Sequence, residues 1–153
     1  MGPIVAVCTG NICRSPIAEG LLRKALAAAG LSSVEVVSAG VSAYDGMPAS
    51  PYAVKAAERV GTDIKAHHSQ QLTPDLVKKA GLILVMTKMH KMMVQQEFGP
   101  VKAPIFLWRE HMESDQQIPD PYGCDEEVYR KCLDSIAEAV PDWVDYIKKQ
   151  SGK

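Results

Sequence analysis

The chain has 153 residues, of which 46% are hydrophobic and 23% charged, and its net charge is −1 at pH 7. This length predicts one domain, residues 1–153, and the composition excludes disordered and collagen-like chains. The small net charge gives no electrostatic reason to bind nucleic acid or an anionic membrane, so we expect neither partner. No apolar run approaches the ~18 residues of a membrane span.

Cysteine usage indicates the compartment. The four cysteines are too few for a disulfide scaffold and suit a reducing cytosol. The N-terminus lacks the charged and long apolar regions of a secretory signal. We therefore expect a cytoplasmic protein. The four histidines show no His/Cys ligand spacing, so we expect neither a metal nor another cofactor.

Apolar runs alternate with helix signals along the chain. Buried strands are predicted at residues 3–7, 34–37, 82–86 and 104–108. Helices are predicted from Ser15 to Gly30, from Ser50 to about Gly61, briefly from Thr73, from Lys88 to about Phe98, and from about Asp125. Ser15, Ser50 and Thr73 each precede a proline, which is typical of a helix start. Pro141 should kink or break the last helix, which then restarts.

Strands separated by helices predict right-handed βαβ units. The fold class is therefore α/β: a single-domain three-layer sandwich, with a four-stranded parallel sheet flanked by helices on both faces. Ligands of such folds bind beyond the carboxyl ends of the strands. Two loops there carry polar residues, one after the first strand and one, residues 109–123, after the fourth.

The loop after the first strand is suited to bind an anion beside a thiolate. It reads CTGNICRSP from Cys8, and Arg14 stands at the mouth of the following helix. Gly10 and Asn11 tolerate the left-handed backbone that a ring of inward-facing amides needs. The helix N-terminus and the guanidinium favour bound phosphate and the thiolate form of Cys8, and Ser15 could donate to the sulfur. The expected phosphate-binding residues are Thr9, Gly10, Asn11, Ile12, Cys13, Arg14 and Ser15.

Cys-x5-Arg alone is a weak pattern; its place between an apolar strand and a helix start makes it specific. The other interpretation of Cys8 is a small buried hydrophobic residue at a strand end. The string CTGNICRSP resembles the phosphate-binding loop of the low-molecular-weight protein tyrosine phosphatase family. The resemblance continues through SAG at 38–40, HHSQQLT around His67 and DPYG at 120–123, and so spans nearly the whole chain.

The resemblance implies a role for each matching residue. Cys8 is the nucleophile that forms a cysteinyl-phosphate, and Arg14 with the amides of residues 9–14 binds the phosphoryl oxygens. Asp120 is the general acid and then the base; its other interpretation is an Asx-turn residue. Ser38 and His67 support Asn11, and we expect His67 to be structural rather than catalytic.

The remaining cysteines and His90 receive separate interpretations. A cysteine at position 13 is frequent in the family, and the resemblance implies that it can trap oxidised Cys8 as a reversible disulfide. Cys124 and Cys132 are expected to be ordinary, partly buried thiols. His90 lies between lysines on a predicted helix, so we expect it at the surface.

Substrate class is where the sequence signals differ. Ile12 is typical of tyrosine phosphatases of the family, whereas arginine phosphatases carry threonine there. Tyr44 and Tyr122 could form aromatic walls around a phenyl ring. Gly123 after a single aromatic, and the GMPASPYAV stretch at 46–54, instead resemble the bacterial arginine phosphatase branch.

We favour hydrolysis of phosphotyrosine in proteins, with inorganic phosphate as product, and keep arginine phosphatase as the alternative. An arsenate reductase is disfavoured because residues 87–99 contain no cysteine. A phosphocysteine carrier would have little use for Asp120, and a non-catalytic phosphate sensor would not need both Cys8 and Arg14.

Overall fold

The strand β1 (Ile4–Cys8) is buried along its whole length, as its run of apolar residues predicts. In the computed structural model, which describes residues 1–152, β1 pairs in parallel with β2 (Val36–Gly40) and with β3 (Leu82–Val85). β4 (Ile105–Leu107) pairs in parallel with β3, and the strand order is β2-β1-β3-β4. The predicted four-stranded parallel sheet is confirmed.

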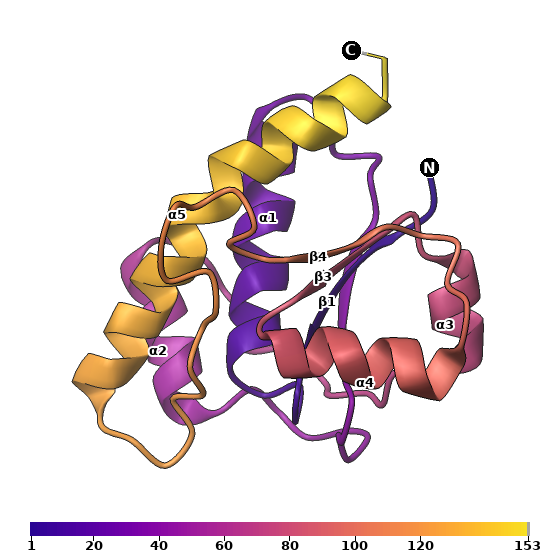
Figure 1. Cartoon of the computed structure of the whole chain (residues 1–153). Coiled ribbons are helices and arrows are strands. Elements are labelled where there is room, and N and C mark those ends of the chain that lie inside the picture. The colour runs from indigo at the N-terminus through magenta and orange to yellow at the C-terminus, as the bar shows by residue number, and fades with distance from the viewer. Residues whose placement is uncertain (153) are drawn as a thin grey trace.

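Helices cover both faces of this sheet (Figure 1). One face packs against α1 (Arg14–Ala28), α2 (Pro51–Arg59) and α5 (Glu126–Gln150), and the other against α3 (Pro74–Lys79) and α4 (Lys88–Phe98). Successive β1 residues alternate between the two cores, so Ile4 joins the α1/α5 core and Val5 joins the α3/α4 core. The predicted three-layer arrangement is also confirmed.

The second strand is displaced from its predicted range of 34–37. It extends to Gly40, although Ser38 and Gly40 are poor strand formers, because pairing with β1 continues to the register Cys8↔Gly40. A side chain at position 40 would clash with the carbonyl oxygen of Thr9 and lie 3.1 Å from the amide nitrogen of Asn11. Glycine therefore lets β2 approach the loop that follows β1.

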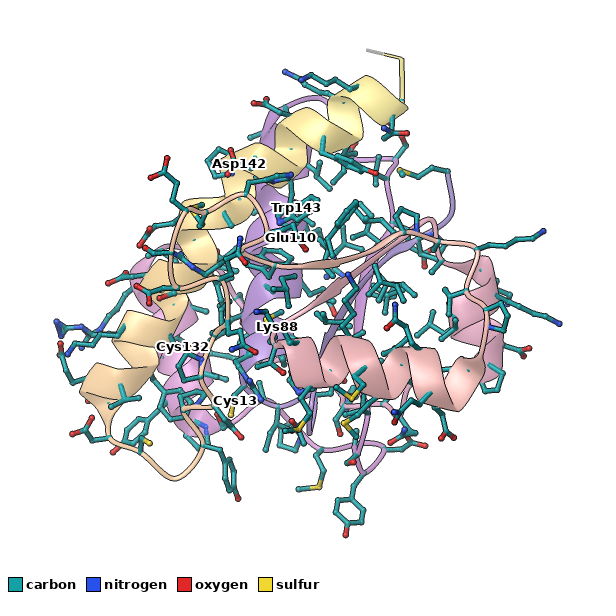
Figure 2. The ribbon with its side chains drawn as sticks, in the orientation of Figure 1. Cys13, Lys88, Glu110, Cys132, Asp142 and Trp143 are labelled. Carbon is teal, nitrogen blue, oxygen red and sulfur yellow. The ribbon has the colours of Figure 1, made fainter. Side chains whose placement is uncertain are left out.

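The predicted break at Pro141 is wrong, because α5 continues through it to Gln150. Proline removes one backbone donor, but residues on both sides of it are fixed in the same core. Ile136 and Trp143 are fully buried. Trp143 reaches from α5 (Figure 2) and its Nε1 donates to the Trp108 carbonyl oxygen at 2.6 Å. No helix within residues 1–152 has the length and apolar character needed to span a bilayer.

Candidate functional site

The loop between β1 and α1 is held from outside through its carbonyl oxygens. Three of them, and the carbonyl oxygen of Cys8 at the end of β1, accept hydrogen bonds from surrounding segments. The pairs are Val41 N to Cys8 O at 3.0 Å, Ser42 N to Thr9 O at 3.0 Å, His67 Nε2 to Asn11 O at 2.7 Å, and Ser50 N to Ile12 O at 2.8 Å. The amide N–H groups of residues 9–14 have no acceptor anywhere in residues 1–152. Their donors are therefore available to an anion at the N-terminus of α1.

The Cys8 thiol lies at the end of β1 and is 2% exposed. Its Sγ is 2.9 Å from Ser15 Oγ, at the distance of a hydrogen bond. Ser15 was predicted to be the N-cap of α1, but the N-cap lies two residues earlier, at Cys13, and makes no side-chain hydrogen bond to the helix, which begins at Arg14. The difference arises because the Ser15 hydroxyl is bound to the loop instead, with Cys8 and the Asn11 amide as its partners.

Asn11 fixes the centre of the loop. Its backbone is left-handed (φ 58°) and the residue is fully buried. Its Nδ2 donates to Ser15 Oγ at 2.7 Å and to Ser38 Oγ at 2.9 Å, and its Oδ1 accepts from the Gln70 amide at 2.9 Å. Ser38 in turn donates to Glu19 at 2.7 Å. The hydroxyl of Ser38 and the ring of His67 thus reach the loop as predicted, through the side chain and the backbone of Asn11 respectively.

The Arg14 guanidinium is buried beside this loop. Its Nη1 donates to the Ile118 carbonyl oxygen at 2.9 Å, and its Nη2 donates to Thr9 Oγ1 at 3.3 Å. The Nε donor is buried without a partner in residues 1–152. A buried, unpartnered donor is costly, so this group suits a site that receives an anion.

Asp120 lies across from Arg14 on the loop that follows β4. Its Oδ2 is 3.8 Å from Arg14 Nη2, and its side chain is 53% exposed. Its Oδ1 accepts from the Tyr122 amide at 3.0 Å, so the Asx-turn interpretation describes its local geometry as well. The loop is anchored through Arg109, whose Nε donates to the Asp115 carbonyl oxygen at 2.6 Å and whose Nη1 donates to the Ser135 carbonyl oxygen at 2.7 Å.

Cys8, Arg14 and Asp120 line one cavity of about 410 Å³. Loop residues form its floor, and aromatic, sulfur-containing and polar side chains form its walls. The lining comprises Cys8, Thr9, Gly10, Ile12, Cys13, Arg14, Ser42, Tyr44, Met47, Asp120 and Tyr122. Tyr44 and Tyr122 are 84% and 65% exposed. The predicted pocket residues therefore meet, and Ser42 and Met47, which were not predicted, also line the cavity.

Cys13, which is labelled in Figure 2, contacts two hydroxyl groups. Its Sγ is 3.3 Å from both Ser50 Oγ and the Tyr129 hydroxyl, which are 3.3 Å from each other. Burial raises the pKa of the Cys13 thiol, and its two hydroxyl partners oppose that rise. Burial likewise raises the pKa of the Tyr129 hydroxyl. At neutral pH both groups therefore keep their protons.

Three predictions about residues away from the loop require correction. His90 is not at the surface: it is 3% exposed, because the first turn of α4 packs against the loop and Nε2 lies 2.9 Å from Thr9 Oγ1. Cys124 is exposed rather than partly buried, because it lies in the turn before α5. Cys132 lies on the buried face of α5, and burial raises its pKa to about 12.

No cluster of three or more His, Cys, Asp or Glu side chains able to hold a metal occurs within residues 1–152. The site instead offers an anion receptor, a thiol and a carboxyl group around one point. Acyl and phosphoryl groups both suit such a set, but the ring of backbone donors and the guanidinium favour the tetrahedral phosphoryl group.

Comparison with known proteins gives the class: the chain is a phosphatase. It belongs to the low molecular weight phosphotyrosine protein phosphatase family, whose sequence model matches residues 3–153. It is 40% identical to a probable low molecular weight protein-tyrosine-phosphatase, EpsP, of Ralstonia nicotianae, over 95% of both chains. It is 35% identical to a protein-arginine-phosphatase of Bacillus subtilis, over 95% of this chain and 97% of that one.

A solved structure has the same fold. It is a cysteine-to-serine mutant of the arginine phosphatase YwlE with a phosphorylated active-site serine, and it superposes with a TM-score of 0.89. The two chains are 34% identical, and 96% of each is covered.

Proposed function

We propose that residues 1–153 form one phosphatase domain that hydrolyses phosphotyrosine in proteins, and small aryl phosphates, through a cysteinyl-phosphate. The observation that carries this proposal is the loop geometry. Its carbonyl oxygens are bound from outside. The amides of residues 9–14 and Arg14 Nε, which lie near the Cys8 thiol, have no acceptor among residues 1–152. A bound phosphoryl group would satisfy these donors.

In the first step, the Cys8 thiolate attacks phosphorus as the bond between phosphorus and the phenolic oxygen breaks. Asp120 gives its proton to the leaving oxygen, and the Ser15 hydroxyl donates to the sulfur. Arg14 and the loop amides hold the phosphoryl oxygens. In the second step, Asp120 takes a proton from water as the water oxygen attacks phosphorus. The S–P bond breaks, phosphate leaves and the thiolate is restored.

The position of Asp120 supports its role in both steps. Its carboxyl group lines the same cavity as Cys8 and is about half exposed, so it can reach both a leaving group and water. Asn11, with Ser38 and His67 behind it, would keep the loop in its anion-binding form before substrate arrives. Such pre-organisation lowers the cost of orienting the reacting groups.

The cavity walls favour phosphotyrosine over phosphoarginine. Ile12 offers no polar contact to a guanidinium, and Tyr44 and Tyr122 offer ring faces to a phenyl group. The 40% identical relative is named a tyrosine phosphatase. Arginine phosphatase is the second candidate, because the turn after Asp120 is Tyr122-Gly123 and a 35% identical relative is named an arginine phosphatase.

The deciding experiment compares phosphotyrosine and phosphoarginine peptides with four proteins: wild type, Cys8→Ser, Asp120→Asn and Ile12→Thr. We expect wild type to prefer phosphotyrosine, Cys8→Ser to be inactive, and Asp120→Asn to lose ~10²–10⁴-fold in kcat. Ile12→Thr should shift the preference toward phosphoarginine. Asp115→Asn is the matched control on the same loop and should remain active. Wild-type preference for phosphoarginine would establish the second candidate, and activity in Cys8→Ser would reject the nucleophile.

We also infer that oxidation links Cys8 and Cys13 and that reduction restores activity. Both thiols line the active-site cavity. Peroxide treatment followed by peptide mapping should find this disulfide, and Cys13→Ser should fail to recover after reduction. Overoxidation of wild-type Cys8 without a disulfide would reject the idea. The small number of cysteines, four in 153 residues, supports a reducing, cytoplasmic location.

A further inference from the structure

His90 is a buried histidine that the proposed reaction leaves without a role. It lies in the first turn of α4, 3% exposed, where that helix meets the loop after β1. Both ring nitrogens are within hydrogen-bond distance of threonine hydroxyls: Nε2 is 2.9 Å from Thr9 Oγ1, and Nδ1 is 3.1 Å from Thr87 Oγ1. Since Thr9 directly follows Cys8, His90 connects α4 to the phosphate-binding loop.

The directions of these hydrogen bonds follow from the neighbouring donors. Arg14 can only donate, so Thr9 Oγ1 accepts from Arg14 Nη2 at 3.3 Å. The Thr9 hydroxyl hydrogen is then free to donate to His90 Nε2. The ring proton lies on Nδ1 and is donated to Thr87 Oγ1, which also accepts from the His90 amide at 3.2 Å. With the other tautomer, the Thr9 hydroxyl hydrogen would have no acceptor in this network.

The surroundings of His90 keep its ring neutral. Burial, followed by the positive charge of Arg14, lowers the pKa of His90 to about 4, and the opposing charge of Asp120 is the smaller effect. A neutral ring can accept from Thr9, whereas an imidazolium would have to donate to it and would repel the guanidinium. The hydrogen-bond chain from Arg14 through Thr9 and His90 to Thr87 is thus consistent at neutral pH.

We propose that His90 is a positioning residue: it orients the Thr9 hydroxyl so that Thr9 Oγ1 accepts from Arg14 Nη2 and restrains the guanidinium for phosphoryl binding. This inference rests on the proposed function, in which Arg14 holds the phosphoryl oxygens. Thr9 and the Ile118 carbonyl oxygen hold two different ends of the guanidinium. If one of these two acceptors is removed, the guanidinium can rotate, so the phosphate site loses part of its pre-organisation.

The test uses His90→Leu, which removes the ring nitrogens, His90→Gln, which retains a polar amide, Thr9→Val, and the Thr9→Val/His90→Leu double variant. The first measurement is the concentration of inorganic phosphate that protects Cys8 from alkylation by iodoacetate, a readout that needs no turnover. The second is kcat and KM on an aryl phosphate. Val94→Ala is the matched control, because Val94 is fully buried on the same helix but packs in the α3/α4 core.

We expect phosphate binding and kcat/KM to fall about tenfold in His90→Leu and in Thr9→Val, as for loss of a hydrogen bond to a charged group. The double variant should lose no more phosphate affinity than either single variant, because both substitutions break the same chain of hydrogen bonds. His90→Gln should retain most of the affinity. Val94→Ala should lower the melting temperature without changing phosphate affinity. If the His90 variants do not fold, the loss in Thr9→Val still has to appear, because Thr9 is exposed at the loop.

Two results would overturn the proposal: unchanged phosphate affinity in folded His90→Leu or in Thr9→Val, or losses that multiply in the double variant. Failure of the proposed function looks different. In that case wild type itself neither hydrolyses the aryl phosphate nor shows phosphate protection of Cys8.

Discussion

Replacement of Asn11 by alanine tests how the phosphate-binding loop is held. The side chain makes three hydrogen bonds, two from Nδ2 and one to Oδ1, and none of it is exposed. At about 1 kcal/mol each, their loss costs about 3 kcal/mol. The left-handed backbone (φ 58°) adds about 1 kcal/mol, since alanine tolerates it less well than asparagine. We therefore expect Asn11→Ala to lower the free energy of unfolding by about 4 kcal/mol.

The glycine variant separates the two contributions. Asn11→Gly loses the same three hydrogen bonds but accepts the left-handed backbone. It should therefore unfold with a free energy about 1 kcal/mol higher than that of Asn11→Ala. Urea titration followed by the fluorescence of the buried Trp108 and Trp143 measures these differences, with the slope m compared between variants.

Activity gives the second readout. Both variants should lose about 10²-fold in kcat/KM at temperatures where they remain folded, because the loop amides are no longer held toward the phosphoryl group. An unfolding free energy for Asn11→Ala within 1 kcal/mol of wild type would refute the reasoning. Equal stabilities of the alanine and glycine variants would refute its backbone part alone.

Three further predictions concern pH, thiol reactivity and close packing. The pKa of His90 is about 4 in the folded protein and 6.5 when unperturbed, so the unfolded state takes up the proton first as the pH falls. His90 should therefore leave the free energy of unfolding unchanged above pH 6.5 and lower it by about 3 kcal/mol as the pH drops to 4. The difference between wild type and His90→Gln in urea titrations at pH 7 and pH 4 measures this fall, and an equal acid loss in both proteins contradicts it. Iodoacetamide at pH 8 should modify the exposed Cys124, and it should modify Cys132 only after urea unfolds the chain, because burial raises the pKa of Cys132 to about 12. Mass spectrometry measures the labelling of each thiol, and equal labelling of the two in the folded protein would contradict this. Gly40→Ala should lower the free energy of unfolding by about 2–3 kcal/mol, because the new methyl group would clash with the Thr9 carbonyl oxygen. Gly46→Ala should lower it by about 1 kcal/mol in the same titration, because position 46 has open space but a positive φ.

The sheet and the loop were predictable because their signals are local. Residues 4–7 are a short buried apolar run, and Cys8 and Arg14 mark the two ends of one strand–loop–helix unit. Within such a unit, the order of residues nearly determines which groups meet. The extension of β2 to Gly40 was not predictable from residue types, since only its pairing with β1 keeps Ser38 and Gly40 in a strand.

Three other residues around the loop escaped prediction for a different reason. Gln70 reaches Asn11 across 59 positions, His90 reaches Thr9 across 81, and Tyr129 reaches Cys13 across 116. Each comes from a separate helix or connection, and its own neighbours in sequence carry no sign of the partner. His90 shows this clearly, because flanking lysines suggest a surface position while the start of α4 packs against the loop. Only the crossing of elements at the sheet edge brings these groups together.

The same geometry explains why substrate choice can be tested without disturbing the chemistry. The Ile12 carbonyl oxygen is held by the Ser50 amide at 2.8 Å, whereas its side chain lines the cavity. Ile12→Thr keeps β-branching, so the loop backbone should keep its conformation while one wall gains a hydroxyl. A change in the phosphotyrosine-to-phosphoarginine ratio at constant phosphate affinity would then belong to the wall alone. A loss of phosphate affinity in the same variant would show instead that position 12 shapes the anion-binding ring, and that the wall and the ring are not independent.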